Sequence, residues 1–209
     1  MAQGAIIEKP AVGGLRLYPA AKRALDVVVS SLGLAASLPV WVMAGLAIIL
    51  DDGPPVFYAQ ERVGLGGRVF RVVKFRSMIR DAEKYTGAVF AEADDPRITR
   101  IGRLLRKTAM DELPQVWNIL KGDMSFVGPR PERPQFVREF VRRIPQYSLR
   151  HQVRPGLTGM AQVYRRYATA PEEKLVYDLM YIRRSSLLTD VTLFFKSWGN
   201  TLLGRWGAG

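Results

Sequence analysis

The chain has 209 residues, 48% of them hydrophobic, with no cysteine, one histidine and a formal net charge of +12. This composition suits one sizeable folded domain and excludes disulfide scaffolds, thiol catalysis and cysteine-based zinc sites. With His151 as the only histidine, a Ser-His-Asp triad is disfavoured, and any metal would need oxygen ligands, which suit Mg²⁺ or Mn²⁺. The positive charge fits three kinds of partner: nucleic acid, an anionic membrane surface or a polyphosphate substrate.

The first long feature is an apolar stretch. Residues 1–20 are rich in Gly, Ala and Pro and are expected to form a loose N-terminal segment. The 24 residues from Val27 to Leu50 then carry no charge. A straight helix of that length reaches about 36 Å, enough to cross a hydrocarbon core of ~30 Å. A cleaved signal peptide fits poorly because the run is too long, and a buried helix of a soluble core is the alternative.

This stretch, taken as residues 21–51, is predicted to be a re-entrant membrane helix. Pro39 lies near its middle and would interrupt or kink a helix. Basic residues prefer the cytoplasmic side of a membrane, and here they flank both ends: Lys9, Arg16, Lys22 and Arg23 before, and Arg62, Arg68, Arg71 and Lys74 after. A helix that breaks at Pro39 and returns keeps both sets in the cytoplasm. A simple span is the alternative. Residues 52–209 would then form a cytoplasmic catalytic domain at the membrane interface.

Two β-rich runs follow the apolar stretch. They are joined at Gly64-Leu65-Gly66-Gly67, which predicts a β-hairpin. Asp94-Asp95-Pro96 is a helix-start signal for the next element.

A ladder of arginines marks the helix expected from Arg97. Basic residues recur at every third position: Arg97, Arg100, Arg103 and Arg106. A guanidinium can bond two phosphate oxygens at once. For the first three residues, a solvated face or one resting on lipid headgroups is an equal alternative. Arg106, closest to the acidic residues that follow, is the predicted phosphate ligand.

The acidic pair Asp111-Glu112 precedes Leu113-Pro114, and proline is favoured in the first turn of a helix. The pair is therefore expected at or just before a helix N-terminus, where both carboxylates can face one site. Helix capping is the alternative interpretation. Carboxylates beside phosphate-binding arginines indicate phosphoryl-transfer chemistry.

Two Gly/Pro-rich turns each hold an arginine. Pro129 and Pro131 flank Arg130, which restricts that residue to an extended backbone, and Arg154 precedes Pro155-Gly156. Rigidly held arginines suit phosphate, so both are predicted phosphate ligands. A purely structural turn is the alternative for Arg154.

The C-terminal part contains two amphipathic candidates, residues 172–184 and 186–206. Trp198 and Trp206 in the second suit a membrane interface. Packing against the core is the alternative, and either segment could join two copies in a homodimer. The expected fold class is α+β, mainly helical and monotopic, with a re-entrant helix, a small hairpin and amphipathic interfacial helices.

Three motifs together resemble one family. They are KFRSM (74–78), DPRITRIGRLLRKTAMDELPQVWNILKGDMSFVGPRP (95–131) and VRPGLTGMAQV (153–163). They resemble the bacterial sugar transferases, the monotopic polyprenol-phosphate phosphoglycosyl transferases, over about residues 20–200.

The resemblance implies that a sugar-1-phosphate moves from a UDP-sugar to undecaprenyl phosphate, with release of UMP. It implies two steps through a covalent phosphosugar on Asp111, with Glu112 in support and Mg²⁺ contacting Asp111. It also implies a re-entrant helix in the bacterial inner membrane, with the catalytic domain on the cytoplasmic face. The family often has Ser-Pro at the helix break, whereas here Leu38 separates Ser37 from Pro39.

Two rival functions remain at this level. One is a membrane-anchored basic scaffold or a nucleic-acid-binding protein. The long uncharged stretch and the lack of a known binding motif disfavour nucleic acid. The other is a glycosyltransferase that releases UDP instead of UMP.

Overall fold

The computed structural model describes residues 17–84, 87, 89, 95–164 and 170–203. Most of the predicted N-terminal segment, and Trp206, lie outside these residues. The described part is mainly helical, with two small sheets and one long apolar helix.

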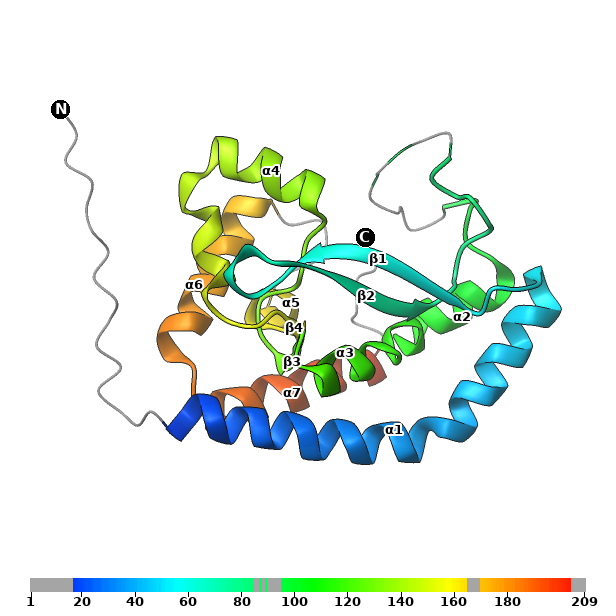
Figure 1. Cartoon of the computed structure of the whole chain (residues 1–209), viewed down its shortest axis with the longest axis horizontal. Helices are drawn as coiled ribbons and strands as arrows, with labels where there is room; N and C mark the ends of the chain where they lie inside the picture. Colours follow the sequence, from blue (N-terminus) through cyan, green and yellow to red (C-terminus); the bar gives the residue numbers. More distant parts are fainter. Residues whose placement is uncertain (1–16, 85–86, 88, 90–94, 165–169, 204–209) are drawn as a thin grey trace.

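The long helix α1 (Leu17–Asp52) contains the whole apolar stretch. Figure 1 shows that it is bent and that the rest of the described chain lies on its concave side. It continues through Pro39 as one helix, so the expected interruption is not a break between two helices. Ser37 donates its hydroxyl to the Leu34 carbonyl at 3.2 Å, a local bond that a helix accommodates with slight bending.

Most of α1 is not part of a protein core. Only 17% of its most apolar window is buried within the protein, and Leu50, Met43 and Leu32 are exposed. A core helix of a soluble protein buries its apolar residues, whereas this helix leaves most of them uncovered. The structure is therefore consistent with a membrane-associated protein.

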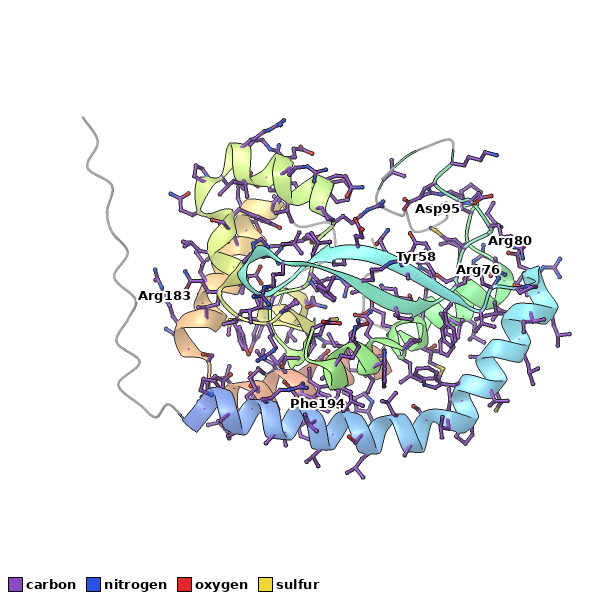
Figure 2. The ribbon with its side chains drawn as sticks, in the orientation of Figure 1. Tyr58, Arg76, Arg80, Asp95, Arg183 and Phe194 are labelled. Atoms are coloured by element: carbon purple, nitrogen blue, oxygen red, sulfur yellow. The ribbon has the colours of Figure 1, made fainter. Side chains whose placement is uncertain are left out.

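Folded segments hold α1 at its C-terminal end. Arg76 donates to the Asp52 carbonyl at 3.0 Å and to the Gly53 carbonyl, and Arg80 donates to the Pro54 carbonyl at 2.7 Å. Figure 2 shows these two arginines beside that end of the helix. Cationic side chains satisfy the last carbonyls of a helix and interact favourably with its dipole.

The predicted hairpin is confirmed. Strands β1 (Phe57–Val63) and β2 (Val69–Phe75) pair antiparallel, from Phe57 opposite Phe75 to Val63 opposite Val69. The short 3₁₀ turn η1 (Leu65–Gly67) joins them, with Gly66 in the left-handed region. On one face Phe75 packs with Trp41 of α1, and on the other Val72 packs with Ile119 and Met124.

The middle of the chain forms two short helices and a one-turn link. Helix α2 (Arg100–Lys107) is capped by Thr99, whose side chain accepts from the Gly102 amide. The helix starts later than the Asp94-Asp95 signal predicts, because Asp95 instead pairs with Arg97. The 3₁₀ turn η2 (Met110–Glu112) and helix α3 (Gln115–Lys121) follow. Helix α3 lies between α1 and β2.

A second sheet brings the two Gly/Pro-rich turns together. Strands β3 (Ser125–Val127) and β4 (Gly156–Thr158) pair in parallel. The backbones approach so closely that a Cβ on Gly156 would meet the Gly128 nitrogen at 2.1 Å. Only glycine fits such a contact.

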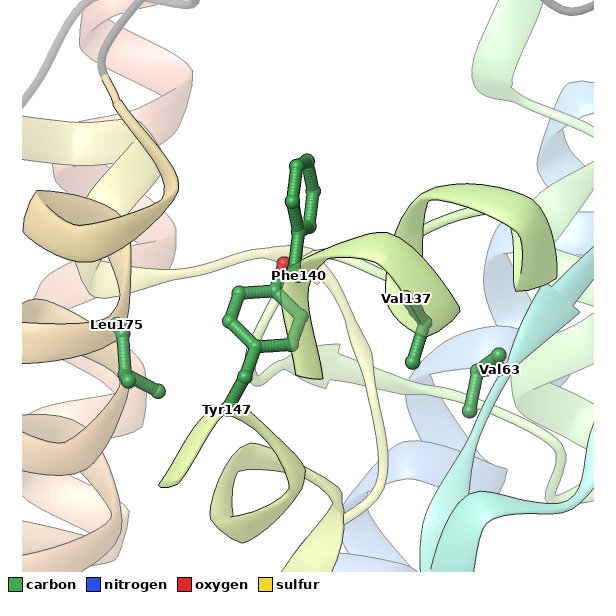
Figure 3. Close-up of a cluster of buried hydrophobic side chains, with 5 residues drawn as sticks. All are labelled: Val63, Val137, Phe140, Tyr147 and Leu175. Atoms are coloured by element: carbon green, nitrogen blue, oxygen red, sulfur yellow. The ribbon is translucent and has the colours of Figure 1, made fainter. Parts of the chain in front are cut away.

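The remaining helices cover the other end of the molecule: α4 (Pro134–Arg143), η3 (Pro145–Gln152), α5 (Met160–Tyr164), α6 (Pro171–Arg184) and α7 (Leu187–Leu202). Figure 3 shows a core formed where α4, η3, α6 and β1 meet, with Tyr147 and Phe140 at its centre. Helix α7 is amphipathic as predicted. Leu193 is buried, whereas Leu188, Phe195 and Trp198 are exposed.

Candidate active site

The acidic pair lies where the sequence places it, just before a helix. Ala109 adopts a left-handed backbone, η2 carries Asp111 and Glu112, and Pro114 is the N-cap of α3. Neither carboxylate caps a helix, because no side-chain bond caps η2 or α3. The capping interpretation is therefore wrong, and the two carboxylates are available for other partners.

Glu112 is held between two cations. Its Oε1 lies 2.6 Å from Lys74 Nζ and 2.6 Å from Arg130 Nη2, and its Oε2 lies 3.3 Å from Arg130 Nη1. Burial alone would raise the pKa of Glu112, but Arg130 and Lys74 outweigh it and hold the pKa well below its usual range. Glu112 therefore stays ionised and fixes the two cations beside Asp111.

Asp111 has the opposite environment. Its residue is only 8% exposed, yet within the described part of the chain no hydrogen bond or ion pair reaches its carboxylate. Burial raises the pKa of Asp111, with Lys74 opposing that shift and the Glu112 charge adding to it. A desolvated carboxylate without a partner is a better nucleophile, and a better metal ligand, than one held in ion pairs.

Arg106 and Arg130 both lie close to the acidic pair, and their role as phosphate ligands stays a prediction. Arg106, at the end of α2, acts electrostatically on Asp111, and its buried Nη1 has no hydrogen-bond partner among the described residues. Arg130 binds Glu112 directly. The remaining ladder residues do not gather here. Arg97 pairs with Asp95, while Arg100 and Arg103 are exposed.

Arg154 lies at the other end of α3. Its Nε donates to the Gly122 carbonyl at 3.0 Å, and Gly122 is the C-cap of that helix. The structure therefore does not bring Arg154 to the acidic pair, and its role as a phosphate ligand stays a prediction.

The sequence interpretation missed two site residues. The sequence indicates Lys74 only as a charge that flanks the apolar stretch, although Lys74 lies within the KFRSM motif that carries the resemblance. Arg150 is nearly fully buried, paired with Asp178 at 2.7 Å, and donates to the Arg130 carbonyl at 2.9 Å. Arg150 lies in η3 and belongs to none of the charge patterns or motifs that the sequence shows.

The described residues supply only part of the ligands that a magnesium ion needs. Among the described residues, no group of three acidic or histidine side chains could hold a metal. Mg²⁺ commonly uses one or two carboxylates and completes its shell with water and substrate phosphates. Asp111, whose carboxylate has no partner among the described residues, fits as such a ligand.

These residues lie within a recognisable family sequence. A model of the family described as bacterial sugar transferase matches residues 17–204. The chain belongs to the bacterial sugar transferase family.

Named relatives of this bacterial sugar transferase come from several bacteria. A UDP-N-acetylgalactosamine-undecaprenyl-phosphate N-acetylgalactosaminephosphotransferase of Aeromonas hydrophila is 43% identical over 90% of this chain and 45% of its own length. UDP-glucose:undecaprenyl-phosphate glucose-1-phosphate transferases of Caulobacter vibrioides and Escherichia coli are 41% and 39% identical. They match 84% and 83% of this chain, and 67% and 38% of their own lengths. The chain thus spans less than half of the Aeromonas and Escherichia relatives.

Proposed function

We propose that this bacterial sugar transferase moves a sugar-1-phosphate from a UDP-sugar to undecaprenyl phosphate and releases UMP. One observation carries the proposal: a buried Asp111 carboxylate that has no partner among the described residues and is acted on by the charges of Lys74, Arg106 and Arg130. The printed names of the relatives describe transfer of this class and support it.

The proposed first step uses Asp111 as the nucleophile. A carboxylate oxygen attacks the donor phosphorus that carries the sugar, and the bond from that phosphorus to the bridging oxygen breaks. UMP leaves with the bonding electrons, and Asp111 holds the phosphosugar as an acyl phosphate. Arg106, with its unpaired Nη1, and the Lys74–Arg130 pair would stabilise the negative charge on the donor.

In the second step, a phosphate oxygen of undecaprenyl phosphate attacks the same phosphorus. The acyl bond breaks, the lipid diphosphate sugar forms, and the Asp111 carboxylate is regenerated. The covalent intermediate splits one difficult transfer into two easier displacements. Burial of Asp111 would protect the acyl phosphate from water.

Mg²⁺ is the proposed cofactor, held by Asp111 and donor phosphates. Bound there, it would neutralise charge on the diphosphate. Glu112 would support the site indirectly, because its ion pairs keep Lys74 and Arg130 in place.

We propose that the chain works at a bacterial inner membrane, with its catalytic part on the cytoplasmic face, because the proposed acceptor is a membrane lipid and the proposed donor is a soluble nucleotide sugar. We propose that α1 is re-entrant. Its first turns contact Asp190 of α7 through Tyr18 and Lys22, and its last turn contacts Arg76. One folded body thus holds both ends, which supports entry and exit on the same side. A homodimer stays a prediction.

The experiment mixes the purified chain with Mg²⁺, undecaprenyl phosphate and a panel of UDP-sugars, and measures UMP. We expect UMP release that Asp111→Asn abolishes. With donor alone, intact mass should show a bound phosphosugar on the wild type but not on Asp111→Asn. The matched control is Glu139→Gln, the same kind of change on the exposed face of α4, which should retain activity. UDP in place of UMP would overturn the proposed reaction, and full activity in Asp111→Asn would overturn the nucleophile.

A further inference from the structure

Asn118 lies in the middle of α3 and is almost completely buried, at 1% exposure. Its side-chain amide binds the backbone of β2. The Val73 N–H donates to Asn118 Oδ1 at 3.0 Å, and Asn118 Nδ2 donates to the Arg71 carbonyl at 2.8 Å. A residue of a neighbouring strand makes the same pair of bonds. The Asn118 amide therefore satisfies backbone groups on the edge of β2 that does not pair with β1, and it attaches α3 to that edge.

This contact fixes the hairpin relative to α3. Strand β1 sets the register of β2 on one edge, but it does not determine where the hairpin lies against the helix. On the other edge, Asn118 holds residues 71 and 73. Val72, between them, packs against Ile119, the next residue of α3.

Lys74 follows Val73 in β2. Its side chain lies on the same face as that of Val72, because side chains alternate along a strand. Its ammonium lies 2.6 Å from Glu112 Oε1. Glu112 in turn lies three positions before Gln115, the first residue of α3. One partner of this ion pair thus lies in β2 and the other lies in η2, the turn just before α3, so Asn118 joins the segments next to both.

The C-terminal end of α3 is fixed through the same residue. The Asn118 carbonyl accepts from the backbone N–H groups of Gly122, Asp123 and Met124 at 3.0–3.3 Å. These bonds close the C-terminal turn of α3 on the same residue that binds β2.

We propose that Asn118 is a positioning residue that holds Lys74 of β2 against the acidic pair, and so sets the charge around Asp111. This inference rests on the proposed function. Asn118 itself touches neither Asp111 nor Glu112 through any of its hydrogen bonds.

The test is a double-mutant cycle between Asn118 and Lys74. Asn118→Ala should lower the rate of UMP release about tenfold to hundredfold, the scale expected for a site displaced by about 1 Å. In a Lys74→Met background, Asn118→Ala should change the rate less than about twofold, because the side chain it positions is already gone. Asn118→Leu keeps the side-chain volume but removes the amide, so it leaves no cavity in the core. It should lower the rate as Asn118→Ala does, and the loss should again be small in the Lys74→Met background.

Two further measurements separate positioning from loss of stability. The KM for the UDP-sugar should rise in Asn118→Ala, because Lys74 no longer neutralises donor charge, whereas loss of folded protein lowers the rate without changing KM. Hydrogen exchange of the Val73 amide should accelerate. The control is Ile119→Val, which loosens the same interface by one methylene but keeps the Asn118 bonds, and should leave both measurements unchanged.

The proposal would be overturned if Asn118→Ala and Asn118→Leu kept the wild-type rate, or if their losses persisted undiminished in Lys74→Met. If the wild type released no UMP from any donor, the proposed function would fail instead. Unchanged Val73 exchange in both Asn118 variants would then still refute the anchoring of β2.

Discussion

Asp111 and Glu112 are neighbours in the chain, but their carboxylates have opposite surroundings. Glu112 forms ion pairs with Lys74 and Arg130, and its pKa is held low. Asp111 is buried without a partner in the described part of the chain, and its pKa is raised. Environments that push two acidic groups apart in pKa often assign them different roles. Here the proposed division is between Glu112 as a structural anion and Asp111 as the nucleophile.

The raised pKa of Asp111 predicts how activity depends on pH. Asp111 must be ionised to attack, so the rate should fall as pH drops through a value above the ordinary aspartate pKa of about 3.9. Lys74 opposes the upward shift, so Lys74→Met should raise the pKa further and move the acid limb of kcat/KM to higher pH. Lys121→Met, at an exposed pair with Asp123, is the control. An acid limb that stayed in place, or moved to lower pH, in Lys74→Met would contradict this assignment.

At the scale of elements, the position of α2 depends on one glycine. Gly102 lies against the backbone where β2 ends, and a Cβ at this position would meet the Ser77 carbonyl oxygen at 2.0 Å. Alanine normally stabilises a helix interior by about 1 kcal/mol relative to glycine. At Gly102 the clash should reverse that sign, because the neighbouring atoms belong to the backbone.

We therefore expect Gly102→Ala to be destabilising by about 1–3 kcal/mol and Gly199→Ala to be neutral or stabilising. Gly199 lies inside α7, and nothing stands within 4 Å of its Cβ position. Thermal unfolding of the two variants in the same detergent measures the difference. Equal melting temperatures would show that α2 can shift away from Ser77 without cost.

Local patterns predicted most of these elements. The glycine-rich turn at 64–67 predicted the hairpin, and Leu113-Pro114 predicted a helix start just after the acidic pair. The contact between Lys74 and Glu112 joins residues 38 positions apart and depends on how a strand docks on a helix. No periodicity in the chain encodes that docking. The placement of Arg154 on Gly122 was missed for the same reason.

At the scale of the whole molecule, α1 is part of the folded body as well as an apolar helix. Asp26 accepts from Ser125 and from the Phe126 amide, at the start of β3. Lys22 and Tyr18 share Asp190 with Tyr181, which also donates to the Val127 carbonyl. The N-terminal half of α1 is thus joined to the strand that leads to Arg130.

The re-entrant arrangement predicts that both flanks of α1 lie in the cytoplasm. The chain has no cysteine, so single cysteines can report topology without background. In intact cells, Ala20→Cys and Arg68→Cys should both resist a membrane-impermeant maleimide, and both should react after lysis. Both positions are exposed in the structure. Labelling of only one of them in intact cells would show a helix that spans the membrane.

The contacts of Arg23 limit how this protein can be shortened for work in solution. From the first helix its guanidinium donates to the Ile119 and Leu120 carbonyls at 2.6 and 2.7 Å, closing the end of α3 opposite to the acidic pair. A truncated version that began after Asp52, made to obtain a detergent-free reagent, would leave those two carbonyls without their Arg23 partner. Exchanging the first helix for an unrelated hydrophobic anchor would have the same effect. The minimum unit for inhibitor screening therefore includes the first helix with its own charged residues.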